Sequence, residues 1–129
     1  MISVCVDPAR ITEAWPHFKD KIESAVSKVG LADFEYIERQ VLDGRALLWL
    51  AWDGETVHAA AVTQLTTDSV CEIVACGGSG LKKFLPLISD LENFAKAENC
   101  RAIRIIGRKG WTKVLTGYEP KAIILERAL

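Results

Sequence analysis

The sequence predicts an α/β domain in which a mixed, mostly antiparallel sheet is flanked by helices. Apolar residues recur at helical spacing in the first third of the chain and in short strand-like runs in the middle. Residues 70–107 then form a strand, glycine-rich turn, helix and strand unit, whose strands become parallel because the helix crosses over the sheet. With 129 residues, the chain has the usual size of one domain, so we expect a single domain over residues 1–129.

The first elements are one strand and two helices. Residues 2–6 alternate in polarity and predict a short strand. Apolar residues at intervals of three and four over residues 11–29 predict an amphipathic helix that ends at Gly30, with Pro16 dividing it into two pieces. A second helix is expected over Asp33–Leu42.

The middle of the chain predicts three antiparallel strands. Ala46–Trp52 and Val57–Leu65 are apolar runs joined by Asp53-Gly54, a strong hairpin-turn dipeptide. Val70–Cys76 continues the meander as the third strand and ends at a glycine-rich turn.

The last part of the chain completes the sheet. An amphipathic helix is expected over residues 84–99, and residues 101–107 predict the strand that runs parallel to Val70–Cys76. Trp111–Thr116 predicts a short helix, and Lys121–Leu125 forms the core of a final strand.

Charge and cysteine content exclude several classes of function. Sixteen Lys and Arg against seventeen Asp and Glu give a net charge of -1, so no general positive field attracts nucleic acid or anionic lipid. No apolar run reaches the roughly 18 residues that a membrane span needs, and a secretory signal pattern is lacking, which predicts a cytoplasmic protein. Four scattered cysteines make no zinc pattern, so we expect no metal and reduced thiols.

Three glycine-containing motifs add to this order of elements. They are Gly78-Ser79-Gly80-Leu81, the stretch Ile105-Ile106-Gly107-Arg108-Lys109-Gly110-Trp111, and Leu115-Thr116-Gly117-Tyr118. Together with the order of strands and helices, they resemble the GNAT-type N-acetyltransferases over nearly the whole chain. The Trp-Asp-Gly hairpin, the Gly-Gly-x-Gly turn and the Gly-Arg-x-Gly-Trp stretch are similar to those of small GNAT-like proteins of phages and prophages.

The resemblance implies that acetyl-CoA is the co-substrate. In that superfamily a Gln/Arg-x-x-Gly-x-Gly/Ala turn holds the pyrophosphate, and a helix N-terminus with close-approaching glycines suits an anion physically. Here Ala75 stands at the first position, so the polar side chain is missing. Lys82 either neutralises a phosphate or is simply solvated. The implied CoA-binding residues are Val74, Cys76, Gly78, Ser79, Gly80, Leu81 and Lys82.

Acetyl transfer needs a base, and Glu72 is the candidate. It interrupts an apolar strand at a place where several acetyltransferases of the superfamily carry a glutamate; the alternative is an outward-facing carboxylate on a half-exposed strand. His58 is a second candidate base, or a hydrogen-bonded histidine beside a turn. The acid tyrosine of the superfamily falls on Lys113, which leaves Tyr118 as the nearest phenol or as a core aromatic.

Two functions follow from these residues. The first is an acetyl-CoA-dependent N-acetyltransferase with an unidentified acceptor amine. The second is a GNAT-like accessory or CoA-binding protein without catalysis, of phage or prophage origin, which Ala75 and Lys113 favour. A homodimer is expected because many members of the superfamily pair through sheet edges or helices.

Overall fold

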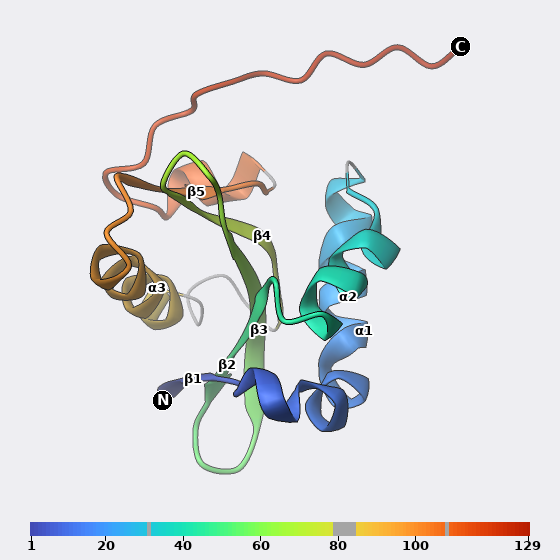
Figure 1. The fold of residues 1–129 in the computed structure, drawn as a ribbon. Coiled ribbons are helices and arrows are strands. Elements are labelled where there is room, and N and C mark those ends of the chain that lie inside the picture. The colour runs from blue at the N-terminus through green and yellow to red at the C-terminus, as the bar shows by residue number, and fades with distance from the viewer. Residues whose placement is uncertain (31, 79–84, 108) are drawn as a thin grey trace.

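A computed structural model describes residues 1–30, 32–78, 85–107 and 109–129, and its centre is one five-stranded sheet (Figure 1). The strands are β1 (Ile2–Cys5), β2 (Leu47–Trp52), β3 (Val57–Leu65), β4 (Val70–Gly78) and β5 (Ala102–Ile105). They are ordered β1-β2-β3-β4-β5, and β4 and β5 form the parallel pair beside three antiparallel pairs. The expected mixed, mostly antiparallel sheet is confirmed.

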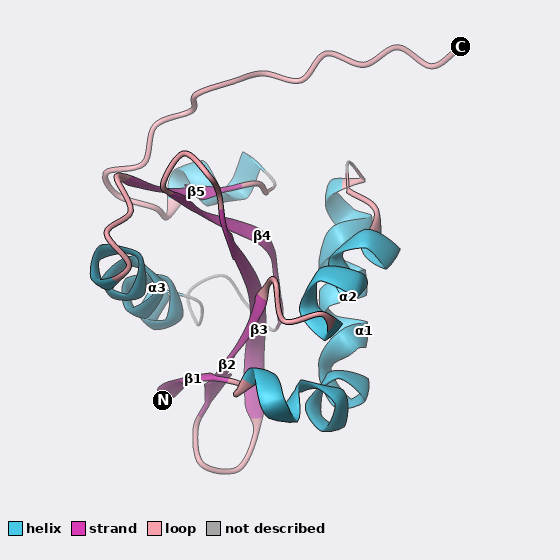
Figure 2. Ribbon diagram, in the orientation of Figure 1, coloured by secondary structure: helices cyan, strands magenta, loops and turns pink. Residues whose placement is uncertain are grey.

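Helices cover both faces of the sheet (Figure 2). Helices α1 (Ile11–Val29) and α2 (Phe34–Leu42) lie on one face, and α3 (Leu85–Ala97) lies on the other. Short 3₁₀ helices, η1 (Pro8–Arg10) and η3 (Lys109–Lys113), precede α1 and follow β5. Each face therefore has its own apolar core, with the alternating side chains of the strands divided between them.

Helix α1 is continuous, and the predicted break at Pro16 is wrong. Its buried side chains, Ile11, Trp15, Ile22 and Val26, form one stripe that spans the proline on both sides. Burial of that stripe against the sheet outweighs the single backbone hydrogen bond that the proline removes. The predicted stop is confirmed, because Gly30 has a left-handed φ of 73° and its N–H donates to the Val26 carbonyl.

The hairpin between β2 and β3 forms where Asp53-Gly54 predicts it. The Asp53 carboxylate accepts the backbone N–H groups of Glu55 and Thr56 at 2.9 and 2.8 Å, and its other oxygen lies 2.5 Å from His58 Nε2. These bonds hold the pKa of Asp53 far below its usual range, with the His58 contact as the largest cause. His58 is thus occupied by the turn.

The C-terminal segment differs from the prediction. Lys121–Leu125 forms no strand, and residues 119–129 extend away from the sheet (Figure 1). Ile123 and Leu125 are 84% and 91% exposed. An apolar run indicates a strand only where a sheet edge receives it, and here the segment does not meet one. In place of the short helix expected over Trp111–Thr116, the structure has the 3₁₀ helix η3.

None of the helices in the described ranges combines the length and apolar character that crossing a membrane requires.

Candidate functional site

Strands β4 and β5 separate halfway along β4. Their parallel pairing runs from Val70 opposite Ala102 to Ile73 opposite Ile105, and its last bond joins the Ile106 N–H to the Ile73 carbonyl at 3.3 Å. Beyond Ile73, β4 continues to Gly78 and pairs with β3 only. Within the described residues, the outer edge of this part of β4 carries backbone groups without a strand partner, which is the usual docking edge for an extended ligand.

A β-bulge lies at the point of separation. Val62 is opposite Ala75 and Thr63 is opposite Ile73, so Val74 is an extra residue in β4 without a counterpart in β3. Bulges bend a strand, re-aim its side chains and are common beside active sites. Val74 and Ala75 accordingly both contribute to the core on the α1 and α2 face.

The first cleft is a cavity of about 590 Å³ between α1, the end of β4 and the end of β5. Its wall is mostly apolar, and charged residues of α1 stand at one side. The lining residues used below are Asp20, Lys21, Lys28, Val74, Cys76, Gly77, Gly78, Ile106 and Trp111.

Helix α1 packs closely on the strand at this cleft. A Cβ added at Gly77 would lie 2.7 Å from the Lys21 carbonyl oxygen and 2.9 Å from the Ala25 Cβ. Only glycine therefore allows the present distance between α1 and the end of β4.

A second cavity, of about 290 Å³, adjoins the first on the α2 side of the sheet. Residues of α2, β3 and β4 line it, and it shares Ala32, Val74 and Ile106 with the first cleft. The bulge residue Val74 thus lies where the two cavities meet. The full lining is Ala32, Tyr36, Ile37, Gln40, Ala46, Val62, Gln64, Glu72, Val74 and Ile106.

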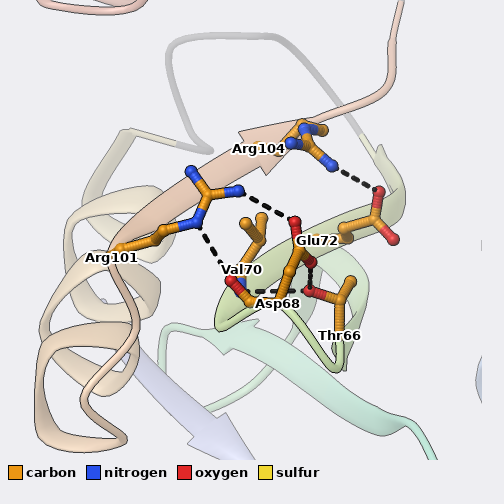
Figure 3. A network of polar contacts seen from close by, with 6 residues as sticks. All are labelled: Thr66, Asp68, Val70, Glu72, Arg101 and Arg104. Atoms are coloured by element: carbon orange, nitrogen blue, oxygen red, sulfur yellow. Dashed lines mark hydrogen bonds and ion pairs between the residues drawn. The ribbon is translucent and has the colours of Figure 1, made fainter.

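Glu72 lines the second cavity. Its side chain is 22% exposed and points toward Arg104 of β5, whose guanidinium lies 3.4 Å from Glu72 Oε2 (Figure 3). Across the sheet Glu72 is opposite Gln64, whose amide donates to Gln40 of α2 at 3.2 Å. Glu72 is therefore on the side of the sheet where the cavities meet, as the hypothesis of a base requires; the role itself stays a prediction.

A network of polar contacts fixes the start of the β4 and β5 pair (Figure 3). Arg101 binds Asp68 through the backbone carbonyl at 3.0 Å and the carboxylate at 2.8 Å. The Thr66 hydroxyl donates to Asp68 and accepts the Val70 N–H, and the Thr66 bond, followed by the Arg101 bond, lowers the pKa of Asp68. The network holds the register that places Glu72 opposite Arg104.

The predicted CoA-binding residues divide into two groups. Val74, Cys76 and Gly78 line the first cleft. Ser79, Gly80, Leu81 and Lys82 lie outside the residues that the structure describes. Burial raises the pKa of Cys76 to about 12, so its thiol is protonated at neutral pH and is a poor nucleophile.

Tyr118 lies on the opposite face of the sheet. It packs against the α3 core, and its hydroxyl donates to Glu92 Oε2 at 2.7 Å. Burial, and then the neighbouring Glu92, raise its pKa. Tyr118 lines neither cavity, so its position gives no support to its predicted role as an acid.

The second cavity was not foreseen from the sequence. Its polar residues besides Glu72 are Tyr36, Gln40 and Gln64. The sequence did contain one indication, because Gln64 is a polar residue near the end of an apolar strand. It does not show which helix packs over that residue. In the described ranges, no group of three or more His, Cys, Asp or Glu is placed to hold a metal ion.

Comparison with known proteins identifies the fold. No protein-family model matches the chain, and no curated protein matches it significantly in sequence. Solved structures do match. A predicted acetyltransferase from Clostridium acetobutylicum, solved with acetyl-CoA, has a TM-score of 0.65 and 14% identity, over 98% of this chain and 95% of that one.

Two other structures agree with the first. A GNAT family acetyltransferase from Staphylococcus aureus has a TM-score of 0.59 and 14% identity, with 99% and 98% of the two chains covered. An aminoglycoside acetyltransferase from an uncultured soil sample, solved with sisomicin, has a TM-score of 0.67 and 8% identity, with 99% and 95% covered. At such identities the likeness shows the fold alone, which is that of the GNAT acetyltransferases.

Proposed function

We propose that this protein is an acetyl-CoA-dependent N-acetyltransferase, in which the first cleft takes the acetyl donor and the second cavity takes the acceptor amine. The observation that carries the proposal is that the two cavities meet at Val74 and Ile106. A transfer between two bound molecules needs such adjacent sites, because the reacting atoms must approach within about 3–3.5 Å.

The first cleft suits a pantetheine arm. That arm is extended and apolar with two amide groups, and the outer edge of β4 beyond Ile73 offers backbone donors and acceptors to it. Val74 and Cys76 are the proposed contacts along the arm. Lys21 and Lys28, at the α1 side of the cleft, supply positive charge for phosphates, together with the predicted turn Gly78-Ser79-Gly80 and Leu81 and Lys82.

The second cavity supplies the base. In acetyl transfer the amine nitrogen forms a bond to the thioester carbonyl carbon, the carbon–sulfur bond breaks, and the amine loses a proton. Glu72 Oε1 has no hydrogen-bond partner among the described residues and is the proposed acceptor of that proton. Because of the bulge, Val74 has no counterpart in β3, and we propose that the backbone N–H of Val74 polarises the carbonyl group of the thioester.

The leaving thiolate requires no acid in this proposal. The thiol that forms from it has a pKa of about 8–9, so the thiolate departs without a proton. Lys113 stands where the superfamily carries its tyrosine, and Tyr118 is on the other face of the sheet. We therefore assign the acid role to neither residue.

A second candidate function is a CoA-binding accessory protein without catalysis. It is favoured by Ala75 and Lys113, which replace two polar groups of the superfamily pattern. Origin from a phage or prophage, a cytoplasmic location and a homodimer are further proposals that rest on the sequence pattern.

Two measurements test the proposal. Calorimetry of the full chain with CoA should show binding, and an assay for released thiol should show acetyl transfer to amines. Glu72→Gln should reduce kcat about 10²- to 10⁴-fold while CoA affinity is retained. The control is Glu55→Gln, the same change on the exposed hairpin.

The outcomes separate the candidates. Absence of CoA binding by the folded protein at millimolar CoA would refute both functions. Binding without transfer to any amine would favour the accessory protein, and an unchanged kcat in Glu72→Gln would exclude Glu72 as the base.

A further inference from the structure

We infer that the acceptor is a small primary monoamine with an apolar body and one uncharged polar group. This inference rests on the proposed function and concerns the second cavity.

The charge of the second cavity limits the acceptor to one ammonium group. Among the described lining residues, Glu72 carries the only charge, and Arg104 already lies 3.4 Å from one of its oxygens. One oxygen therefore remains for an amine. A second ammonium group would be removed from water without a carboxylate to receive it, which is unfavourable. Polyamines and aminoglycosides carry several ammonium groups and do not fit this lining.

The uncharged polar groups of the cavity predict the second feature of the ligand. Gln64 donates to Gln40 Oε1, and this leaves the Gln40 NH₂ and the Gln64 carbonyl oxygen without a partner among the described residues. A donor and an acceptor side by side match an amide or a hydroxyl group. The phenol of Tyr36, on the same helix as Gln40, stands at the rim and is 52% exposed.

The remaining lining is apolar, and the cavity is small. Its volume of about 290 Å³ is at the lower limit of ligand pockets, which measure about 300–1,000 Å³. Aliphatic side chains surround the polar groups and favour an apolar body on the ligand. These side chains are Ala32, Ile37, Ala46, Val62, Val74 and Ile106.

The test compares two amines that differ by one charge. Leucinamide has a primary amine, an apolar side chain and an uncharged amide, and lysinamide adds a second ammonium group. Each is titrated into the full chain without acetyl-CoA, and the side-chain amide resonances of Gln40 and Gln64 are followed by NMR. We expect leucinamide to bind at least about tenfold more tightly, because lysinamide must leave one ammonium group unpaired.

A charge variant should remove the preference for leucinamide. Gln40→Glu still accepts the hydrogen bond from Gln64 and adds a carboxylate to the lining, so the advantage of leucinamide should disappear. The control is Asn93→Asp, which makes the same charge change at an exposed position of α3, on the opposite face. It should leave the preference unchanged.

Three results would overturn the inference. Lysinamide binding the wild-type protein as tightly as leucinamide would refute the charge argument. Tighter binding of the tripeptide amide Leu-Gly-Gly-NH₂ would indicate a peptide acceptor. If no amine shifts the two glutamine resonances although CoA binds, the acceptor site is elsewhere. Failure of CoA itself to bind would instead refute the proposed function.

Discussion

The contact between α1 and the end of β4 allows a sharp test of how the first cleft is built. Gly77→Ala adds one methyl group at a position where the Lys21 carbonyl oxygen and the Ala25 Cβ would lie 2.7 and 2.9 Å away. Both neighbours belong to α1, and the nearer one is backbone, so neither can move by a simple change of rotamer. The helix has to shift away from the strand.

The size of the effect follows from these distances. Non-bonded carbon atoms prefer about 3.5–4.0 Å, so α1 must move by roughly 0.5–1 Å. Overpacking of this kind costs about 1–3 kcal/mol. In a chain of this length we expect the melting temperature to fall by roughly 4–15 °C. Because Gly77 lines the first cleft, we also expect weaker CoA binding.

Thermal unfolding followed by circular dichroism measures the first effect, and calorimetry with CoA measures the second. Gly110→Ala is the matched control, because a Cβ at Gly110 would have no atom within 4 Å. If Gly77→Ala melts at the same temperature as Gly110→Ala, then α1 does not pack on β4 as described.

Three other predictions concern the core, a thiol and the C-terminal segment. Thr63→Val should lower the free energy of unfolding in urea by about 1–3 kcal/mol, because the buried indole N–H of Trp49 loses the Thr63 hydroxyl that accepts its hydrogen bond at 3.0 Å. Adding Trp49→Phe should restore part of this loss, and fully additive effects of the two substitutions would contradict the explanation. Cys76 should react with iodoacetamide at pH 8 roughly a thousandfold more slowly in the folded than in the unfolded chain, because its thiolate fraction falls by about that factor; mass spectrometry of the alkylated protein measures the two rates. Because the pKa of Cys76 rises from 9.0 to about 12 on folding, the stability that goes with its protonated thiol is fully present at neutral pH and is lost as the pH rises from about 9 to about 12. Equal alkylation rates in the folded and the unfolded chain would refute the burial of the thiol. Removal of residues 120–129 should change the free energy of unfolding in urea by less than about 0.5 kcal/mol, because the side chains of this segment are exposed, and a larger loss would show that the segment packs on the domain.

Local sequence signals predicted most of the sheet. The bounds of β3, Val57–Leu65, are those expected from its apolar run, and the Asp53-Gly54 turn forms because its side-chain and backbone bonds are local. Two predictions whose outcome depends on distant parts of the chain were wrong. Pro16 breaks an isolated helix but not one held by its packing, and the apolar run Lys121–Leu125 does not become a strand without an edge to join.

The candidate site was predicted in part. Glu72 was the candidate base because a charged residue interrupts an apolar strand; the structure shows that it lines a cavity, and its role as a base stays a prediction. Two residues near Glu72 come from distant parts of the chain: Gln40 of α2 precedes it by 32 residues, and Arg104 of β5 follows it by 32 residues. Only the packing of α2 over the sheet and the register of β4 with β5 bring them together, and neither is a local property of the sequence.

The separation of β4 from β5 also bears on the order in which the molecule assembles. Strands β2, β3 and β4 are consecutive, so their hairpins close short loops, whereas Val70 meets Ala102 only after the whole of α3 has intervened. Loop closure becomes less favourable as the loop lengthens, and local contacts tend to form first. We therefore expect the meander to appear early and β5 to dock late. The first cleft, which needs the end of β5, would be among the last features to form, so a nascent chain that already contains Glu72 would still lack the cleft that we propose for the acetyl donor.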